Sequence, residues 1–246
     1  MKLPLAAAAF ALTLFAGAPL HAAPSAEANS AFETGIEAYR TGDLDAAVAA
    51  WTTSADGGHP MSAFLLGRLY EQGRGVEQSD YRSFKYYQMA ADEGQAQAGV
   101  KVGKIYLTGN KDLKIDRDYK MAIKYFEIGG LSSWPESQYM LADMYRRGLG
   151  VNADRTEGLR WLILSAKKKY APSHVALARI YFEGEGVLVD RVKGWSYIEL
   201  ASRFAEGDEG KEVNAIMDKY NKRMKPGEKE AASAEADAWV AEFASN

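Results

Sequence analysis

One sequence unit recurs along the chain, and this repetition constrains the fold more than any other feature. Three segments, Leu66 to Val76, Leu141 to Val151 and Leu177 to Val187, carry a Tyr and a pair of glycines at the same places. A fourth copy runs from Val102 to Ile115, where the loop after the Tyr is longer. The four tyrosines are Tyr70, Tyr106, Tyr145 and Tyr181, which are 36, 39 and 36 residues apart. A period of this length predicts an array of stacked supersecondary units.

Each copy is expected to form a helical hairpin. After the glycines comes a stretch in which apolar residues recur at three- and four-residue spacing, as at Tyr197, Ile198 and Ala201, and this spacing is typical of a helix. Pro60 and Pro135 suit the first turn of the first helix. The residues predicted to cap the second helix are Ser79, Asp118, Asp154 and Asp190. The residues predicted to end the first helix are Gly73, Gly148 and Gly184.

Small residues recur inside the first helix of each unit. One series is Ser62, Ala98, Ser137 and Ser173, and the other is Gly67, Gly103, Ala142 and Ala178. Small side chains let two helices approach closely, and we expect the Tyr three positions after the second series to fill the groove between neighbouring hairpins. One hairpin cannot bury such a face alone, so the units must stack to be stable.

The units resemble the Sel-1-like repeat, a helical-hairpin relative of the tetratricopeptide repeat. The second, fourth and fifth units match its motif, small-x-x-x-Leu-Gly-x-x-Tyr-x-x-Gly-x-Gly-Val, and the third departs from it at Ile115 and lacks one loop glycine. The first unit, which contains Trp51, looks more like a plain tetratricopeptide repeat. The resemblance implies an all-α fold: a right-handed superhelical solenoid of about five helical hairpins with a helical C-terminal cap.

The predicted organisation follows from the position of these units, because the period ends after Arg203. The predicted ranges are a signal peptide at 1–22, a short linker at 23–28, a tetratricopeptide-like repeat at 29–59, Sel-1-like repeats at 60–95, 96–134 (with the loop insertion), 135–170 and 171–205, and a helical cap at 206–246.

The N-terminal segment has the order of an export signal. Lys2 precedes an apolar run from Leu5 to Phe15, and small residues follow at Ala22 and Ala23. The run is about half the roughly 20 residues of a membrane-spanning helix, and no later segment approaches that length, so no membrane association is expected after cleavage. We expect cleavage after Ala22. The resemblance implies a periplasmic location in a bacterium, with secretion as the second choice.

Composition argues against several classes of function. The chain has 30 Lys and Arg against 33 Asp and Glu, a net charge of −3, which disfavours nucleic acid as a partner. It has no Cys, and beyond the signal only His59 and His174 remain, so no catalytic set, metal site or cofactor is predicted. Both histidines are expected to be surface or packing residues. Carboxylates are plentiful, so a catalytic carboxylate pair stays open.

The best-supported activity is binding. In a stack of this kind the first helices line the concave face, and their outward positions form rows across the repeats. The candidate partner-binding residues in these rows are Phe64, Arg68, Glu71, Lys104, Leu107, Tyr139, Asp143, Arg146, Arg179 and Phe182. Aromatic and aliphatic side chains mixed with guanidinium groups suit a groove that anchors a peptide and pairs with its carboxylates.

The sequence therefore predicts an exported, non-catalytic scaffold that binds another protein or a peptide. By resemblance, the partner is an envelope or signalling protein. The alternative is a cell-wall or β-lactam-related ligand-binding protein or hydrolase. Secreted relatives of that kind are cysteine-rich, and this chain departs from them in having no Cys.

Overall fold

The computed structural model describes residues 23–243 and is built of helices, as predicted. The helices are α1 (Ala26–Thr41), α2 (Leu44–Asp56), α3 (Pro60–Gln72), α4 (Asp80–Asp92), α5 (Ala96–Thr108), α6 (Tyr119–Leu131), α7 (Pro135–Arg147), α8 (Arg155–Lys167), α9 (Ala171–Glu183), α10 (Arg191–Phe204), α11 (Asp208–Asn221) and α12 (Glu228–Phe243). Within these residues the only strand-like pairing is one isolated bridge, between Asn110 and Ile115 in the lengthened loop. The predicted all-α repeat solenoid is confirmed.

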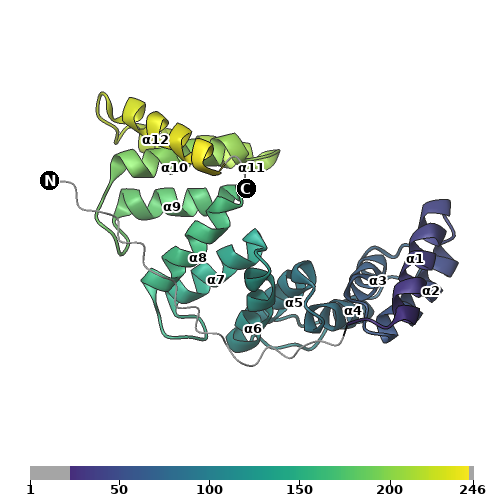
Figure 1. Ribbon diagram of the computed structural model, residues 1–246. Helices are drawn as coiled ribbons and strands as arrows, with labels where there is room; N and C mark the ends of the chain where they lie inside the picture. Colours follow the sequence, from purple (N-terminus) through teal and green to yellow (C-terminus); the bar gives the residue numbers. More distant parts are fainter. Residues whose placement is uncertain (1–22, 244–246) are drawn as a thin grey trace.

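The helices pair into five hairpins that follow one another along an arc (Figure 1). Each odd-numbered helix from α1 to α9 packs against the helix after it, and each hairpin also packs against the next. The first helices α5 and α7 of neighbouring units also contact each other, and α9 contacts α11, which follows the last repeat. The first helices therefore line the inner, concave side of the arc, while α6 and α8 lie on its outer side.

The helix ends are set by the residues that the sequence predicted. The side chains of Ser79, Asp118, Asp154 and Asp190 each accept a hydrogen bond from a backbone N–H in the first turn of the following helix. Gly73, Gly148 and Gly184 end the first helices with φ of 64°, 68° and 73°, a left-handed conformation that glycine adopts without steric cost. Local capping chemistry thus fixes where each hairpin turns.

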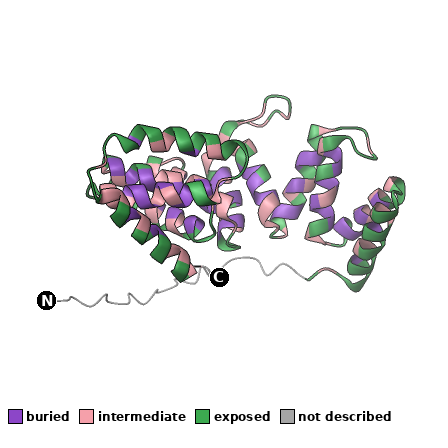
Figure 2. Cartoon of the chain, turned by 90° about the horizontal axis from the view of Figure 1, so that it is seen from above, coloured by how far each residue is buried: buried purple, intermediate pink, exposed green. Residues whose placement is uncertain are grey.

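Close packing inside each hairpin depends on the small residues of the first helix. A Cβ on Gly67 would lie 2.7 Å from Cδ1 of Tyr87, and a Cβ on Gly103 would lie 2.7 Å from Cε1 of Phe126. The second helix therefore sets an aromatic ring directly on the backbone of the first. Buried residues lie on both helices of each hairpin, and they are fewest on α1, where only Ala28 and Gly35 are buried (Figure 2).

The motif tyrosines do not fill the groove between hairpins in the way that the sequence suggested. Three of them stack on a Tyr of the second helix in their own hairpin. These pairs are Tyr70 with Tyr86, Tyr106 with Tyr125, and Tyr181 with Tyr197, with ring centroids 5.5, 5.7 and 5.7 Å apart. Tyr106 also meets Phe84 of the preceding unit edge-on at 6.1 Å. The motif Tyr therefore mainly closes its own hairpin, because the second helix presents an aromatic partner at the matching turn.

Buried hydroxyls join some neighbouring hairpins. Ser62 Oγ on α3 donates to Ser54 Oγ on α2 (2.7 Å), and Ser54 Oγ donates to the carbonyl of Ala28 on α1 (2.6 Å). The fourth and fifth hairpins are joined by the equivalent bonds from Ser173 to Ser165 and from Ser165 to the Pro135 carbonyl, at 2.6 Å each. These bonds satisfy polar groups that lie out of reach of water.

The junction between the third and fourth hairpins lacks this bonding. Gly129 lies where the first and the last junctions have Ser54 and Ser165, and a Cβ there would meet Ser137 Oγ at 2.0 Å. The buried Ser137 hydroxyl has no hydrogen-bond partner within the part of the chain that the structure describes. The repeat therefore uses one position in two ways, as a hydrogen-bonding link or as a close backbone contact.

Two further helices complete the C-terminal end. α12 packs on α10, with Ala232 and Ala236 fully buried, and its Trp239 ring lies 5.0 Å from the ring of His174. α11 is held by Tyr220, which stacks on Phe182 at 4.1 Å. The predicted signal peptide, residues 1–22, lies outside the described residues. None of the described helices is long and apolar enough to span a bilayer.

Candidate functional site

The concave face is hollowed near its C-terminal end, where α7, α8, α9 and α11 meet. Two adjoining hollows share Tyr139 and Arg179, and together we call them the C-terminal groove. The apolar hollow, about 190 Å³, is lined by Tyr139, Ala171, Pro172, Val175, Arg179, Glu209, Glu212, Val213 and Ile216. The arginine hollow, about 330 Å³, is lined by Tyr139, Asp143, Arg146, Arg147, Arg155, Leu162, Ala176, Arg179 and Glu185.

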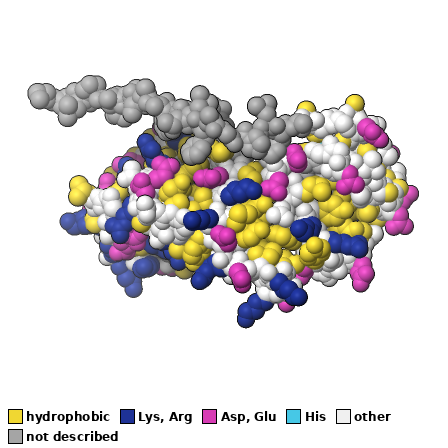
Figure 3. Space-filling view, turned by 90° about the horizontal axis from the view of Figure 1, so that it is seen from below, with side chains coloured by type: hydrophobic (Ala, Val, Ile, Leu, Met, Phe, Trp, Pro, Cys, Tyr) yellow, Lys and Arg dark blue, Asp and Glu magenta, His cyan; other side chains and the backbone are white. Residues whose placement is uncertain are grey.

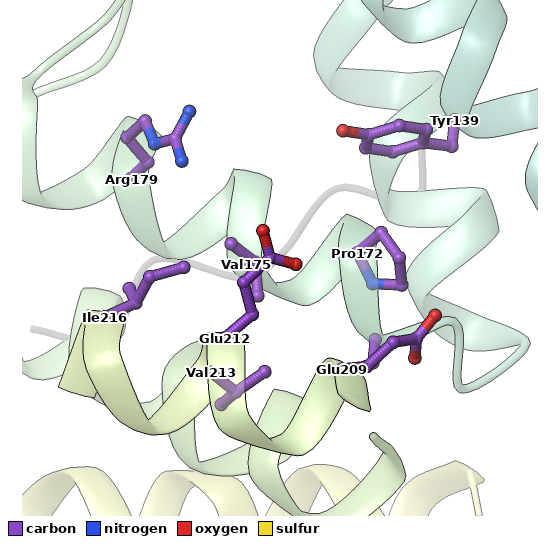
Figure 4. A pocket seen from close by; sticks show the side chains of 9 residues that line it. Tyr139, Pro172, Val175, Arg179, Glu209, Glu212, Val213 and Ile216 are labelled. Atoms are coloured by element: carbon purple, nitrogen blue, oxygen red, sulfur yellow. The ribbon is translucent and has the colours of Figure 1, made fainter. Parts of the chain in front are cut away.

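The apolar hollow lies between α9 and α11. Pro172 and Val175 on α9 face Ile216 on α11, and all three are half-buried (Figure 4). Tyr139 reaches in from α7, and burial raises the pKa of its phenol, with the Asp143 carboxylate adding to the effect. Glu209 lies at the end of the hollow opposite Arg179. The hollow thus has apolar walls, a neutral phenol, and opposite charges at its two ends.

The arginine hollow contains more positive than negative side chains. Arg146 forms an ion pair with Glu185, and Arg147 Nη1 lies 2.9 Å from Asp143 Oδ2. Arg155 and Arg179 are exposed and make no hydrogen bond or ion pair with any described residue. Two guanidinium groups therefore remain available to a ligand, each with donors arranged to bind a carboxylate at two points.

Four of the ten predicted binding residues come together in this groove. They are Tyr139, Asp143, Arg146 and Arg179. These residues came from three different rows of the repeat pattern, and the structure brings them together because α7 and α9 both border the C-terminal groove.

Two predicted binding residues belong to the hydrophobic core instead. Phe182 is fully buried beneath Tyr220 of α11, and Phe64 is only 7% exposed and packs against Tyr87. Neither ring lines the groove. Leu107 is half-buried and packs into the cluster around Phe126. The repeat positions predicted a surface location for these apolar side chains because they describe the first helices only. The residues that cover these side chains belong to other helices.

The remaining predicted residues lie towards the N-terminal end, where most of their charges are paired. Glu71 accepts hydrogen bonds from the Tyr87 hydroxyl and from Lys101 Nζ, both at 2.7 Å, and Lys104 pairs with Glu136 of the next unit. Arg68 is exposed on α3. On the face seen in Figure 3, side chains of both charges alternate with hydrophobic patches, so no single sign of charge dominates that face.

Sequence reasoning missed several groove residues. Arg155 lies just after an N-cap, a position that the repeat rows did not sample, and Pro172 lies in the first turn of α9. Glu209, Glu212 and Ile216 belong to α11, which follows the last repeat and carries no motif. No repeat-based signal could have placed α11 against α9.

The two histidines have structural roles. His59 Nδ1 accepts a hydrogen bond from the Ser62 N–H (3.2 Å) and so caps α3. His174 is fully buried, its Nε2 lies 3.1 Å from the Ala166 carbonyl, and burial lowers its pKa to about 4. Among the described residues no group of three or more His, Asp or Glu side chains is placed to hold a metal ion.

Comparison with known proteins identifies the family to which these hairpins belong. The family model described as "Sel1 repeat" matches residues 60–95, 96–130, 135–170 and 171–203, which correspond to the second to fifth hairpins. The chain belongs to the Sel1 repeat family. Sel1 repeat proteins are generally scaffolds for protein–protein interactions, so the Sel1 hairpins described above are of a kind used for binding.

Individual Sel1 repeat relatives extend this finding. The exopolysaccharide production negative regulators of Rhizobium leguminosarum bv. viciae and Rhizobium meliloti (strain 1021) are 30% and 29% identical over 143 and 142 residues. Each match covers 53% of this chain and 53% of the relative, so the chain spans about half the length of these regulators. A Sel1 repeat protein crystal structure from Oxalobacter formigenes aligns with a TM-score of 0.55 and 26% identity, over 71% of this chain and 70% of that one.

Proposed function

We propose that this Sel1 repeat protein is an exported, non-catalytic scaffold that binds a protein or peptide segment in the C-terminal groove. One observation carries the proposal: two arginines, Arg155 and Arg179, line a concave hollow without an ionic partner among the described residues. An unpaired charge in a concave site gains more from a ligand than a charge on an open, flat surface does.

The proposed compartment is the bacterial periplasm, and the proposed partner is an envelope or signalling protein. The compartment rests on the charge, apolar run and small residues of segment 1–22. The class of partner is supported by the two Rhizobium relatives, which are named as regulators of exopolysaccharide production. Mass spectrometry of the protein from a periplasmic fraction tests export. We expect Ala23 as the first residue, and recovery of the intact N-terminus in the cytoplasmic fraction would contradict it.

Site-specific photo-crosslinking in cells tests the scaffold role. A benzoylphenylalanine at Val175, inside the groove, is expected to capture a discrete partner. The same group at Leu164, which is 40% exposed on α8, serves as the matched control outside the groove. Equal capture from both positions, or none from Val175, would count against the groove as the binding site.

The absence of catalysis is tested separately. Purified protein is expected to leave a reporter β-lactam and peptidoglycan unchanged. Turnover of either that is lost when one carboxylate is replaced would show a hydrolase and overturn the scaffold proposal.

A further inference from the structure

The C-terminal groove carries positive side chains on α8 and α9 and negative side chains on α11, and this distribution of charge limits which ligands it can bind. Arg155 and Arg179 lie on the side formed by α8 and α9, and Glu209 and Glu212 lie on α11. All four side chains are exposed, and none makes a side-chain hydrogen bond or ion pair with another described residue. Pro172 and Val175 of α9 and Ile216 of α11 form the apolar wall between Arg179 and Glu209, and the Glu212 carboxylate lies near the middle of the hollow, beside Val175 (Figure 4).

From this arrangement we propose that the groove binds a peptide segment in which an apolar residue is flanked by an acidic residue on one side and a basic residue on the other. This inference rests on the proposed function and adds the chemistry of the ligand to it. The acidic residue pairs with Arg155 and Arg179, the apolar side chain enters the apolar hollow, and the basic residue faces Glu209 and Glu212.

The arginine side selects a carboxylate. Of the four arginines that line the arginine hollow, two are already neutralised, Arg146 by Glu185 and Arg147 by Asp143. The other two have free donors, and a charge-assisted bond from a guanidinium to a carboxylate is about twice as strong as a neutral hydrogen bond.

The size of the apolar hollow selects a single side chain. Its volume is about 190 Å³, below the range of roughly 300–1,000 Å³ of pockets that enclose drug-sized molecules. Its walls are Pro172, Val175 and Ile216, with the buried Ala171 and Val213 beneath. Apolar anchors of this kind supply much of the affinity at protein interfaces, because they are fully desolvated on binding.

The α11 carboxylates exclude uniformly acidic ligands. Glu209 and Glu212 line the same hollow as Arg179, so a strongly acidic segment or a nucleic acid would meet like charges as soon as it extended past the arginines. A basic residue at that place is attracted instead. Because of α11, the groove does not simply bind any carboxylate. It favours a ligand that has an acidic residue beside the arginines and a basic residue beside the α11 carboxylates.

Selection from a random 12-residue peptide library displayed on phage, with the purified chain 23–246 as bait, tests the inference. Peptides recovered from the selection are then synthesised with a fluorescein label, and their dissociation constants are measured by fluorescence anisotropy. We expect the enriched peptides to combine an acidic, an apolar and a basic residue. Enrichment of uniformly acidic, uniformly basic or purely apolar peptides would overturn the inference.

Charge reversal provides the second part of the test. Arg179→Glu is expected to weaken a selected peptide at least tenfold, whereas Lys120→Glu, the same charge change on the exposed part of α6, changes binding less than twofold. A peptide whose acidic residue is replaced by Lys is expected to prefer Arg179→Glu over the unmodified protein. Binding that ignores Arg179→Glu would overturn the inference.

The two proposals can fail separately. If crosslinking from Val175 captures a partner but no library peptide is enriched, or the enriched peptides lack the charge order, the inferred ligand chemistry is wrong and the scaffold function stands. If selected peptides obey the charge order but no partner is captured in cells, the chemistry stands and the proposed scaffold role in the cell is wrong.

Discussion

The two ends of the concave face differ in how their charged side chains are paired. Towards the N-terminus, Glu71 and Lys104 are engaged in ion pairs that cross from one hairpin to the next. Towards the C-terminus, Arg155 and Arg179 remain unpaired beside two hollows. Charged residues recur at both ends of the concave face, so a charged residue at a repeat position is not enough to form a binding site. A charged side chain is available to a ligand only where no neighbouring side chain already pairs with it.

Replacing Phe182 should produce the largest change in stability. This ring is fully buried and carries α11 through its stack on Tyr220, so Phe182→Ala is expected to lower the free energy of unfolding by about 3–5 kcal/mol. Leu107 occupies the same place in the third repeat but is half-buried, and Leu107→Ala should cost less, about 2 kcal/mol or below. Urea unfolding followed by circular dichroism measures the unfolding free energy of both variants. An equal loss of free energy would contradict the difference in burial between the two positions.

A pH series separates the two histidines. The pKa of His174 in the folded protein is about 4, below its ordinary value of 6.5, so the unfolded chain binds a proton more readily. Stability should therefore fall as the pH drops from 6.5 towards 4, by up to roughly 3 kcal/mol. His174→Gln should remove this part of the pH dependence.

His59 provides the matched comparison at the N-terminal end. Burial also lowers its pKa, but the side chain is only partly covered, so His59→Gln should change the pH dependence less. Comparing each variant with the unmodified protein at the same pH cancels the titration of the carboxylates. A pH profile that is unchanged by His174→Gln would contradict the assignment.

Replacing one arginine at each end of the concave face tests which end binds the peptide. Arg179→Ala is expected to weaken a groove-bound peptide about tenfold or more, equivalent to about 1.4 kcal/mol. Arg68→Ala, on the exposed surface of α3, should change affinity less than twofold. Fluorescence anisotropy with one labelled peptide measures both variants. Thermal unfolding should stay within about 0.5 kcal/mol of the unmodified protein, since both side chains are exposed. Equal losses of affinity would mean that the ligand covers the whole concave face.

Serine replacements should have the smallest effect and test the hairpin junctions. Ser173→Ala removes a buried hydrogen bond to Ser165 and should cost about 1 kcal/mol. Ser137→Ala removes a buried hydroxyl that has no partner among the described residues, and it should be neutral or slightly stabilising. Urea unfolding of the two variants side by side distinguishes them, and an equal loss would show that Ser137 is hydrogen-bonded in solution.

Local features of the fold were readable from the sequence because they depend on neighbours in the chain. The caps at Ser79 and Asp154, and the left-handed glycines at Gly73 and Gly148, lie where their residue types predicted. A side-chain oxygen beside the first turn of a helix, or a residue without a Cβ after the last turn, acts over a few residues only. Their positions therefore follow from the chain itself.

The candidate site was only partly readable because it depends on contacts between distant segments. The helix period correctly predicted that Tyr139 and Arg179 lie on the concave face. The same periodicity also predicted a surface position for Phe182, which is in fact covered by α11. Arg155 and Glu212 gave no signal at all, since one lies at a helix start and the other lies beyond the last repeat.

The sequence by itself determined the repeated helical hairpin, the residues that cap its helices and the membership of a repeat family, because each of these is encoded by short-range spacing and capping. Only the tertiary structure decided which charged side chains are neutralised, which aromatic rings are buried, and where the concave face stays hollow. These properties depend on helices that are adjacent in space and far apart in sequence, as α7, α9 and α11 are around the C-terminal groove.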